Sequence, residues 1–136
     1  MRRLLLVFLL KYMRAVELGA FCAYHGHFKR TKDKMIFSIA LDELDHADIL
    51  RIILNAYESK PSKIMDNSIS FVGKTIGSLC KVCPLWSLNL VASLLEKINV
   101  INYGTVSKLC SNEKHKFIFN HLLETEKEHD EYFRSL

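Results

Sequence analysis

Four glutamates interrupt four otherwise apolar stripes, and this pattern constrains the fold more than any other feature of the chain. Each stripe recurs at steps of three, four and seven residues, a spacing that places side chains on one face of an α-helix. The four residues are Glu17, Glu43, Glu96 and Glu126. An ionised carboxylate is almost never buried without a partner. One such residue could mark a misjudged face, but four, one on each stripe, predict a shared polar site inside a helical bundle.

The stripes predict four long helices, over about residues 3–28, 32–58, 85–109 and 112–134. Scarce turn-forming residues support long helices, because the 136 residues include only 5 glycines and 2 prolines. We expect Gly26 and the basic run at 29–32 to end the first helix, and Asn112 to cap the last one. The segment 59–84 contains most of the remaining breakers and is interpreted as a long connection with room for one helix of its own.

The spacing of the glutamates predicts the topology. It is 26 residues from Glu17 to Glu43, 53 from Glu43 to Glu96, and 30 from Glu96 to Glu126. The outer intervals suit antiparallel hairpins, whereas the middle one requires a crossover. We therefore expect an all-α, ferritin-like four-helix bundle with a long crossover between helices 2 and 3, formed by one domain over residues 1–136.

Two of the glutamates are each followed three residues later by a histidine, as Glu43 with His46 and Glu126 with His129. Residues i and i+3 project from the same side of a helix, so each pair can reach one point. Two such pairs plus two single glutamates are the ligand set of di-iron and di-manganese carboxylate bundles. We expect two iron ions, with manganese as the other candidate. The competing interpretation is a set of buried salt bridges with Lys or Arg.

Several motifs resemble those of the demethoxyubiquinone hydroxylases, the di-iron family of ubiquinone biosynthesis. The resemblance extends from about Glu17 to His129 and rests on the following motifs: Glu17-Leu18-Gly19-Ala20 with Tyr24, both Glu-x-x-His pairs, Lys60-Pro61-Ser62, and Glu96 followed seven residues later by Tyr103.

This resemblance implies a monooxygenase that uses O2 to hydroxylate a lipid-tailed demethoxyubiquinol, with a reductant that the sequence leaves open. The metal ligands that it implies are Glu17, Glu43, His46, Glu96, Glu126 and His129. Tyr103 is the implied catalytic residue, because it would lie beside the metals and assist electron or proton movement.

Two other functions stay open at this point. One is a ferroxidase or iron-handling protein of the ferritin and rubrerythrin type, although the lone C-x-x-C at Cys80 and Cys83 is not the pair of motifs expected for a rubredoxin-like module. The other is a bundle without catalytic activity that keeps its metal site for stability or interaction. Two histidines, His25 and His27, are interpreted as surface residues near a helix end.

Location and partners follow from charge and hydropathy. Between residues 69 and 95 the only charged side chains are Lys74 and Lys81, and Trp86 suits a membrane interface. This stretch is either a peripheral membrane surface that admits a quinone tail, or a buried core or dimer interface. We expect a homo-oligomer in the cytoplasm, on the inner face of a bacterial cell membrane, or alternatively on the matrix side of the mitochondrial inner membrane. Basic and acidic residues alternate, which argues against a nucleic-acid partner.

Overall fold

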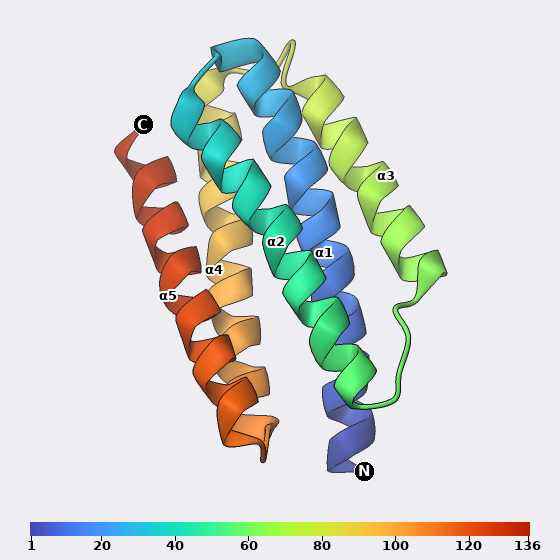
Figure 1. Ribbon diagram of the computed structural model, residues 1–136. Helices are drawn as coiled ribbons and strands as arrows, with labels where there is room; N and C mark the ends of the chain where they lie inside the picture. Colours follow the sequence, from blue (N-terminus) through green and yellow to red (C-terminus); the bar gives the residue numbers. More distant parts are fainter.

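The computed structural model describes residues 1–136 as five α-helices without strands (Figure 1). The helices are α1 (Arg2–Thr31), α2 (Lys34–Ala56), α3 (Lys63–Leu79), α4 (Leu85–Leu109) and α5 (Glu113–Ser135). Four of them are long, and α3 lies in the connection between the second and third long helices. The predicted all-α bundle with a crossover is therefore confirmed, and the crossover contains the one helix for which the sequence leaves room.

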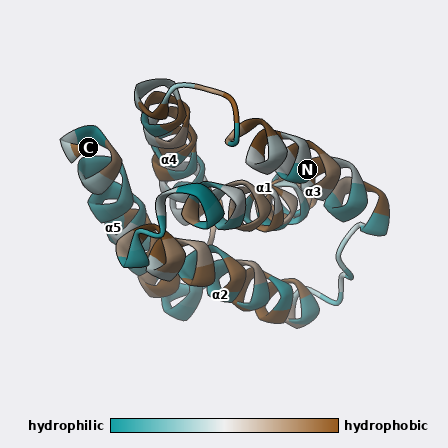
Figure 2. Cartoon of the chain, turned by 90° about the horizontal axis from the view of Figure 1, so that it is seen from above, coloured by the Kyte–Doolittle hydropathy of each residue, from teal (hydrophilic) through white to brown (hydrophobic).

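The four long helices form a closed ring, and α3 lies outside it. Helix α1 packs against α2 and α4, and α5 packs against α4 and α2. Among the helices, α3 packs only against α1. Viewed from above, α1 lies between α3 and the rest of the bundle (Figure 2). No helix combines the length and the apolar character needed to cross a bilayer.

Helix α1 continues beyond its predicted end, so the interpretation of Gly26 as a terminator was wrong. The helix ends at Thr31, where Lys32 adopts a left-handed conformation with φ of 59°, and the side chain of Asp33 then caps α2 by accepting the N–H of Met35. Gly26 instead contacts α3, since a Cβ there would lie 2.3 Å from the Cα of Gly77. Glycine is needed at this position because two helix backbones touch.

The other predicted ends agree closely with the structure. Helix α4 spans Leu85–Leu109, as expected. Asn112 caps α5, because its side chain accepts the N–H groups of Lys114 and His115.

Two apolar clusters fill the interior, one at each end of the bundle. One contains Leu10 of α1, Leu50 of α2 and Phe119 of α5, and the other contains Ala20 of α1, Ile39 of α2 and Phe133 of α5. Along α1, Glu17 lies between the residues of the two clusters, and the other three glutamates occupy the same level of their helices. The fold therefore positions one polar layer between two apolar ones.

Candidate metal centre

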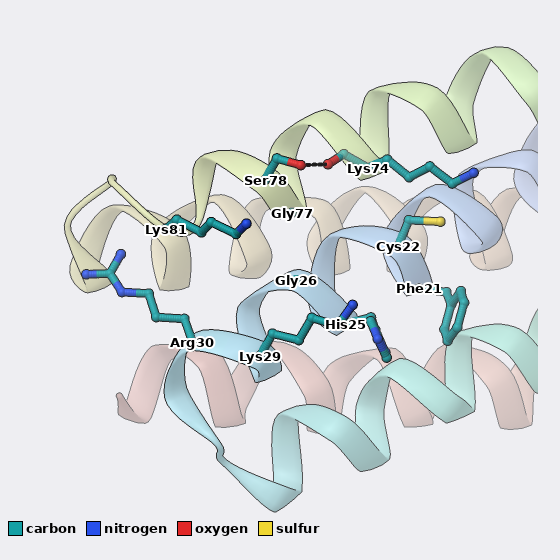
Figure 3. Close-up of a pocket in the computed structure, with 10 residues that line it drawn as sticks. All are labelled: Phe21, Cys22, His25, Gly26, Lys29, Arg30, Lys74, Gly77, Ser78 and Lys81. Carbon is teal, nitrogen blue, oxygen red and sulfur yellow. Dashed lines mark hydrogen bonds between the residues drawn. The ribbon is translucent and has the colours of Figure 1, made fainter.

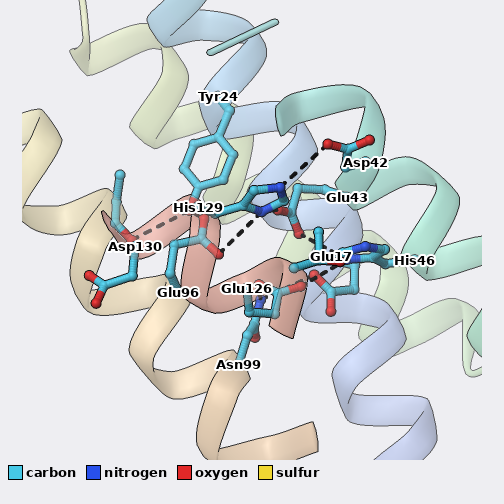
Figure 4. A network of polar contacts seen from close by, with 12 residues as sticks. Glu17, Tyr24, Asp42, Glu43, His46, Glu96, Asn99, Glu126, His129 and Asp130 are labelled. Atoms are coloured by element: carbon cyan, nitrogen blue, oxygen red, sulfur yellow. Dashed lines mark hydrogen bonds and ion pairs between the residues drawn. The ribbon is translucent and has the colours of Figure 1, made fainter. Parts of the chain in front are cut away.

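All four predicted glutamates meet in the centre of the bundle, one from each long helix. Glu17, Glu43, Glu96 and Glu126 are each 0 % exposed, and His46 and His129 are each 5 % exposed. The close-up shows the side chains of all six converging from α1, α2, α4 and α5 (Figure 4). The structure thus brings together every residue that the sequence proposed for the site.

The six residues form two overlapping groups. One consists of Glu17, Glu43, His46 and Glu126, and the other of Glu43, Glu96, Glu126 and His129; within each group the potential ligand atoms lie within 4.8 Å of one another. Glu43 and Glu126 belong to both groups, whereas each remaining glutamate and histidine belongs to one. This arrangement suits two cations that share two carboxylates, with one further carboxylate and one imidazole completing each position.

Each histidine faces the glutamate of the opposite Glu-x-x-His pair. Nδ1 of His46 lies 2.8 Å from Oε1 of Glu126, and Nδ1 of His129 lies 3.1 Å from Oε1 of Glu43. On the other side of the second ring, Nε2 of His129 lies 3.4 Å from a carboxylate oxygen of Asp42. Asp42 therefore orients this imidazole, as carboxylates behind metal-binding histidines do.

Two tyrosines donate hydrogen bonds to Glu17 and Glu96, the glutamates that belong to only one ligand group each. Each tyrosine lies on the helix of the other glutamate. Tyr24 follows Glu17 by seven residues and donates its hydroxyl proton to Glu96. Tyr103 follows Glu96 by seven residues and donates to Glu17 at 2.5 Å. Tyr103 is fully buried. The structure thus places the residue with the implied catalytic role directly against a potential ligand.

Asn99 is a member of the site that sequence reasoning missed. Its amide nitrogen donates to Glu17 at 3.1 Å and to Glu126 at 3.3 Å, and its side chain is buried. The available signal was its position three residues after Glu96, which places it on the same face of α4. Asparagine at an apolar stripe position can therefore mark a support for buried carboxylates.

The electrostatics of the site are those of several acidic groups crowded together in a buried interior. Burial raises the pKa of Glu17, and it raises the pKa values of Glu43 and Glu126 well above their usual range, with repulsion among the glutamates adding to the effect. Burial lowers the pKa of His46 to about 3. Burial also lowers the pKa of His129, but the negative charges of Glu96 and Asp42 outweigh this effect and leave the pKa above its usual value.

The glutamates have no basic partner other than the two histidines. Every ion pair of the four carboxylates involves His46 or His129, so the alternative of salt bridges with Lys or Arg was wrong. Buried oxygens of Glu43, Glu96 and Glu126 lack any hydrogen-bond partner. Nδ1 of His46 also lacks one, because its short contact with Glu126 does not have hydrogen-bond geometry. These oxygen and nitrogen atoms lack partners and face one interior point, as expected for the ligands of a pair of divalent cations.

The remaining histidine and cysteine predictions have mixed outcomes. His27 is only 2 % exposed and stacks on Phe133, so its interpretation as a surface residue was wrong. It faces the apolar cluster at its end of the bundle because α1 continues beyond Gly26. Cys80 and Cys83 belong to neither ligand group.

Comparison with known proteins gave one match. The model of the Rubrerythrin family matches residues 11–136, a range that includes all six residues of the centre. No curated protein and no solved structure matched the chain. The absence of a second C-x-x-C pair, which argued against a rubrerythrin, therefore does not exclude the family.

Proposed function

We propose that this chain, which belongs to the ferritin-like rubrerythrin family, is a di-iron carboxylate oxidoreductase. The observation that carries the proposal is the pair of overlapping ligand groups that share Glu43 and Glu126. In this proposal Glu43 and Glu126 would help to hold both ions. Glu17 with Nδ1 of His46 would complete one position, and Glu96 with Nδ1 of His129 would complete the other.

The donor chemistry favours iron. Imidazole and carboxylate together suit iron or manganese, and no thiolate is present in either group, which argues against a zinc–sulfur site. Ferrous ions bound there would supply the electrons that activate dioxygen. The protein's own contribution is positional, because Tyr24, Tyr103 and Asn99 hold the carboxylates and the flanking apolar clusters exclude water.

Metal analysis tests this assignment directly. After anaerobic loading with Fe(II) we expect about two ions per chain, and both Glu43→Ala and His129→Ala should lose metal. His121→Ala is the matched control, since His121 is exposed on the same helix as His129. Fewer than about one ion per chain in the unmodified protein would rule out a di-iron site. Unchanged metal content in both site variants would show that the ligands are wrongly assigned.

For the substrate, we propose a lipid-tailed quinol of the demethoxyubiquinol type, which the chain would hydroxylate with O2. An apolar groove supports this choice. It consists of two adjoining cavities of about 180 and 170 Å³ that share Ala23, Ile76 and Leu95, and it runs between α3 and α4 over α1. Tyr24 lines the first cavity and donates to Glu96, so the groove reaches a residue that contacts a proposed ligand of the centre.

The rim of this groove supports peripheral membrane contact. Several large apolar side chains that line it are also exposed, including Val72 and Leu79 from α3 and Val91 and Ile98 from α4. A lipid-tailed substrate could enter from a bilayer through such a surface.

The proposed reaction inserts one oxygen atom into a ring C–H bond, and the second oxygen leaves as water after two electrons and two protons arrive from a separate reductant.

Family membership favours a second candidate, an iron-handling ferroxidase, in which Fe(II) is itself the substrate. A variant that fills the groove separates the two. Ile76→Trp should reduce the incorporation of oxygen from labelled O2 into a quinol without slowing Fe(II) oxidation. Ile52→Trp, on an exposed position of α2, is the control and should change neither rate. If the unmodified protein oxidises Fe(II) but incorporates no labelled oxygen into the quinol, the ferroxidase is favoured.

A further inference from the structure

A second cleft lies between α1 and α3 and shares no residue with the apolar groove. We propose that it binds a small phosphate-bearing anion, independently of the metal centre. Its volume of about 590 Å³ falls within the range of roughly 300–1,000 Å³ that is usual for small-molecule pockets.

The charge of the cleft is the first argument. Lys29, Arg30, Lys74 and Lys81 line it, and no acidic residue does. None of the three lysines takes part in any ion pair of the structure. The guanidinium of Arg30 donates to the carbonyl oxygens of Cys80 and Cys83, which fixes its positive charge beside the turn after α3. Figure 3 shows the lysine side chains extending around the contact of the two helices.

A simpler explanation accounts for only part of this charge. Basic residues are favoured in the last turn of a helix, where they complement the helix dipole, and this explains Lys29 and Arg30 near the end of α1. The same explanation covers Lys81, which follows the C-terminal end of α3, but it does not cover Lys74, which lies within α3. Four basic side chains that line one concave surface without an acidic neighbour suit a ligand with more than one negative charge.

The floor and wall of the cleft are the second argument. Gly26 and Gly77 touch through their backbones, so no side chain covers the floor. The imidazole of His25 forms part of the wall. The ring of Phe21 lies next to that of His25, with centroids 5.8 Å apart. An open floor and several ammonium groups suit phosphate oxygens, because lysine binds phosphate as a point charge.

The phosphate could belong to a free metabolite or to a lipid headgroup, and the chemistry of recognition is the same. Calorimetric titration with inorganic pyrophosphate tests the first source. Sedimentation with vesicles of phosphatidylglycerol, compared with phosphatidylcholine, tests the second. The key variant is the triple substitution Lys29→Gln, Lys74→Gln and Lys81→Gln, whose side chains are all exposed, so folding should be retained.

The control removes the same charge elsewhere, through Lys63→Gln, Lys97→Gln and Lys108→Gln, which are also exposed. Because the control variant leaves the metal centre unchanged, any binding of pyrophosphate at that centre would still be measured with it. We expect the cleft variant to bind about tenfold more weakly, or worse, than the control. Ser78→Glu, which adds one negative charge to the cleft, should have the same direction of effect.

The two assays decide both the proposal and the source. Weakened pyrophosphate binding in the cleft variant alone supports a free phosphate ligand, and weakened vesicle binding in that variant alone supports a lipid headgroup. Equal behaviour of the cleft variant and the control in both assays would overturn the proposal. So would the absence of any saturable binding by the unmodified protein.

Discussion

The buried glutamates make the metal-free protein sensitive to pH. For Glu43 and Glu126, burial and mutual repulsion raise the folded pKa well above the ordinary value of 4.5. The stability that these groups contribute is therefore fully present below the unfolded pKa and is lost as pH rises through the raised folded pKa. Bound cations would cancel the repulsion.

We accordingly expect the melting temperature of the metal-free protein to fall as pH rises from about 5 to about 8. Metal-free Glu43→Gln should melt higher than the unmodified protein at the upper pH, because it carries one buried charge fewer. Glu124→Gln, at an exposed site on α5, should leave the profile unchanged. A metal-free protein that becomes more stable with rising pH, with Glu43→Gln following the same curve, would contradict this account.

Tyr103 should support Glu17 in two ways. Removing its hydroxyl with Tyr103→Phe leaves Glu17 with Asn99 as its remaining side-chain donor, and should lower the free energy of unfolding by about 1–3 kcal/mol. Urea denaturation measures this loss. Tyr12→Phe is the control, since no hydrogen bond of the Tyr12 hydroxyl is present.

If Tyr103 also assists turnover, Tyr103→Phe should reduce quinol hydroxylation while the metal content stays the same. Equal activity of the two proteins would limit the role of Tyr103 to positioning Glu17.

At the scale of elements, the attachment of α3 depends on glycine. A Cβ at Gly73 would lie 2.1 Å from the carbonyl oxygen of Gly19, and one at Gly26 would lie 2.3 Å from Gly77. Because α3 packs against no other helix, these backbone contacts determine how it covers α1. Helix α3 bounds both the apolar groove and the cleft that Lys29, Lys74 and Lys81 line, so both depend on the backbone contact between α1 and α3.

Gly26→Ala should therefore destabilise the protein by about 1–3 kcal/mol, as overpacking commonly does, and should increase hydrogen exchange in α3. Gly104→Ala is a matched control inside α4, where the new methyl group would meet only Leu123 at 3.5 Å. It should stabilise the protein by roughly 0.5–1 kcal/mol, because alanine is the better helix former. Both quantities come from urea denaturation. Equal stability of the two variants would argue against the close backbone contact.

At the scale of the molecule, the centre connects all four helices of the ring. Ions bound only by the folded state should stabilise it by about 2.7 kcal/mol at a free concentration one hundred times the dissociation constant. For a chain of this length that corresponds to a rise of roughly 8 °C in melting temperature. Calorimetry with anaerobic Fe(II) measures it, and His129→Ala should show a smaller rise. An identical rise in both proteins would place the bound metal elsewhere.

Much of this molecule follows from local patterns. Helical periodicity placed Glu43 and His46 on the buried face of α2, and the 53-residue interval from Glu43 to Glu96 required the crossover. Asn99 was missed because its position three residues after Glu96 does not distinguish a residue that supports the site from any other amide on that face. The end of α1 was misplaced because a glycine that admits a neighbouring helix has the same sequence signal as one that ends a helix.

The sequence by itself determined which six side chains meet in the interior, because the face that a residue occupies depends only on its position within its own helix. Tertiary structure alone decided that Glu43 and Glu126 lie between the other ligands, that the tyrosines donate to opposite helices, and that Lys29, Lys74 and Lys81 share one cleft. These features depend on how far each helix is rotated and shifted along its neighbours. That choice is made by side-chain packing across the whole bundle, which no single segment encodes.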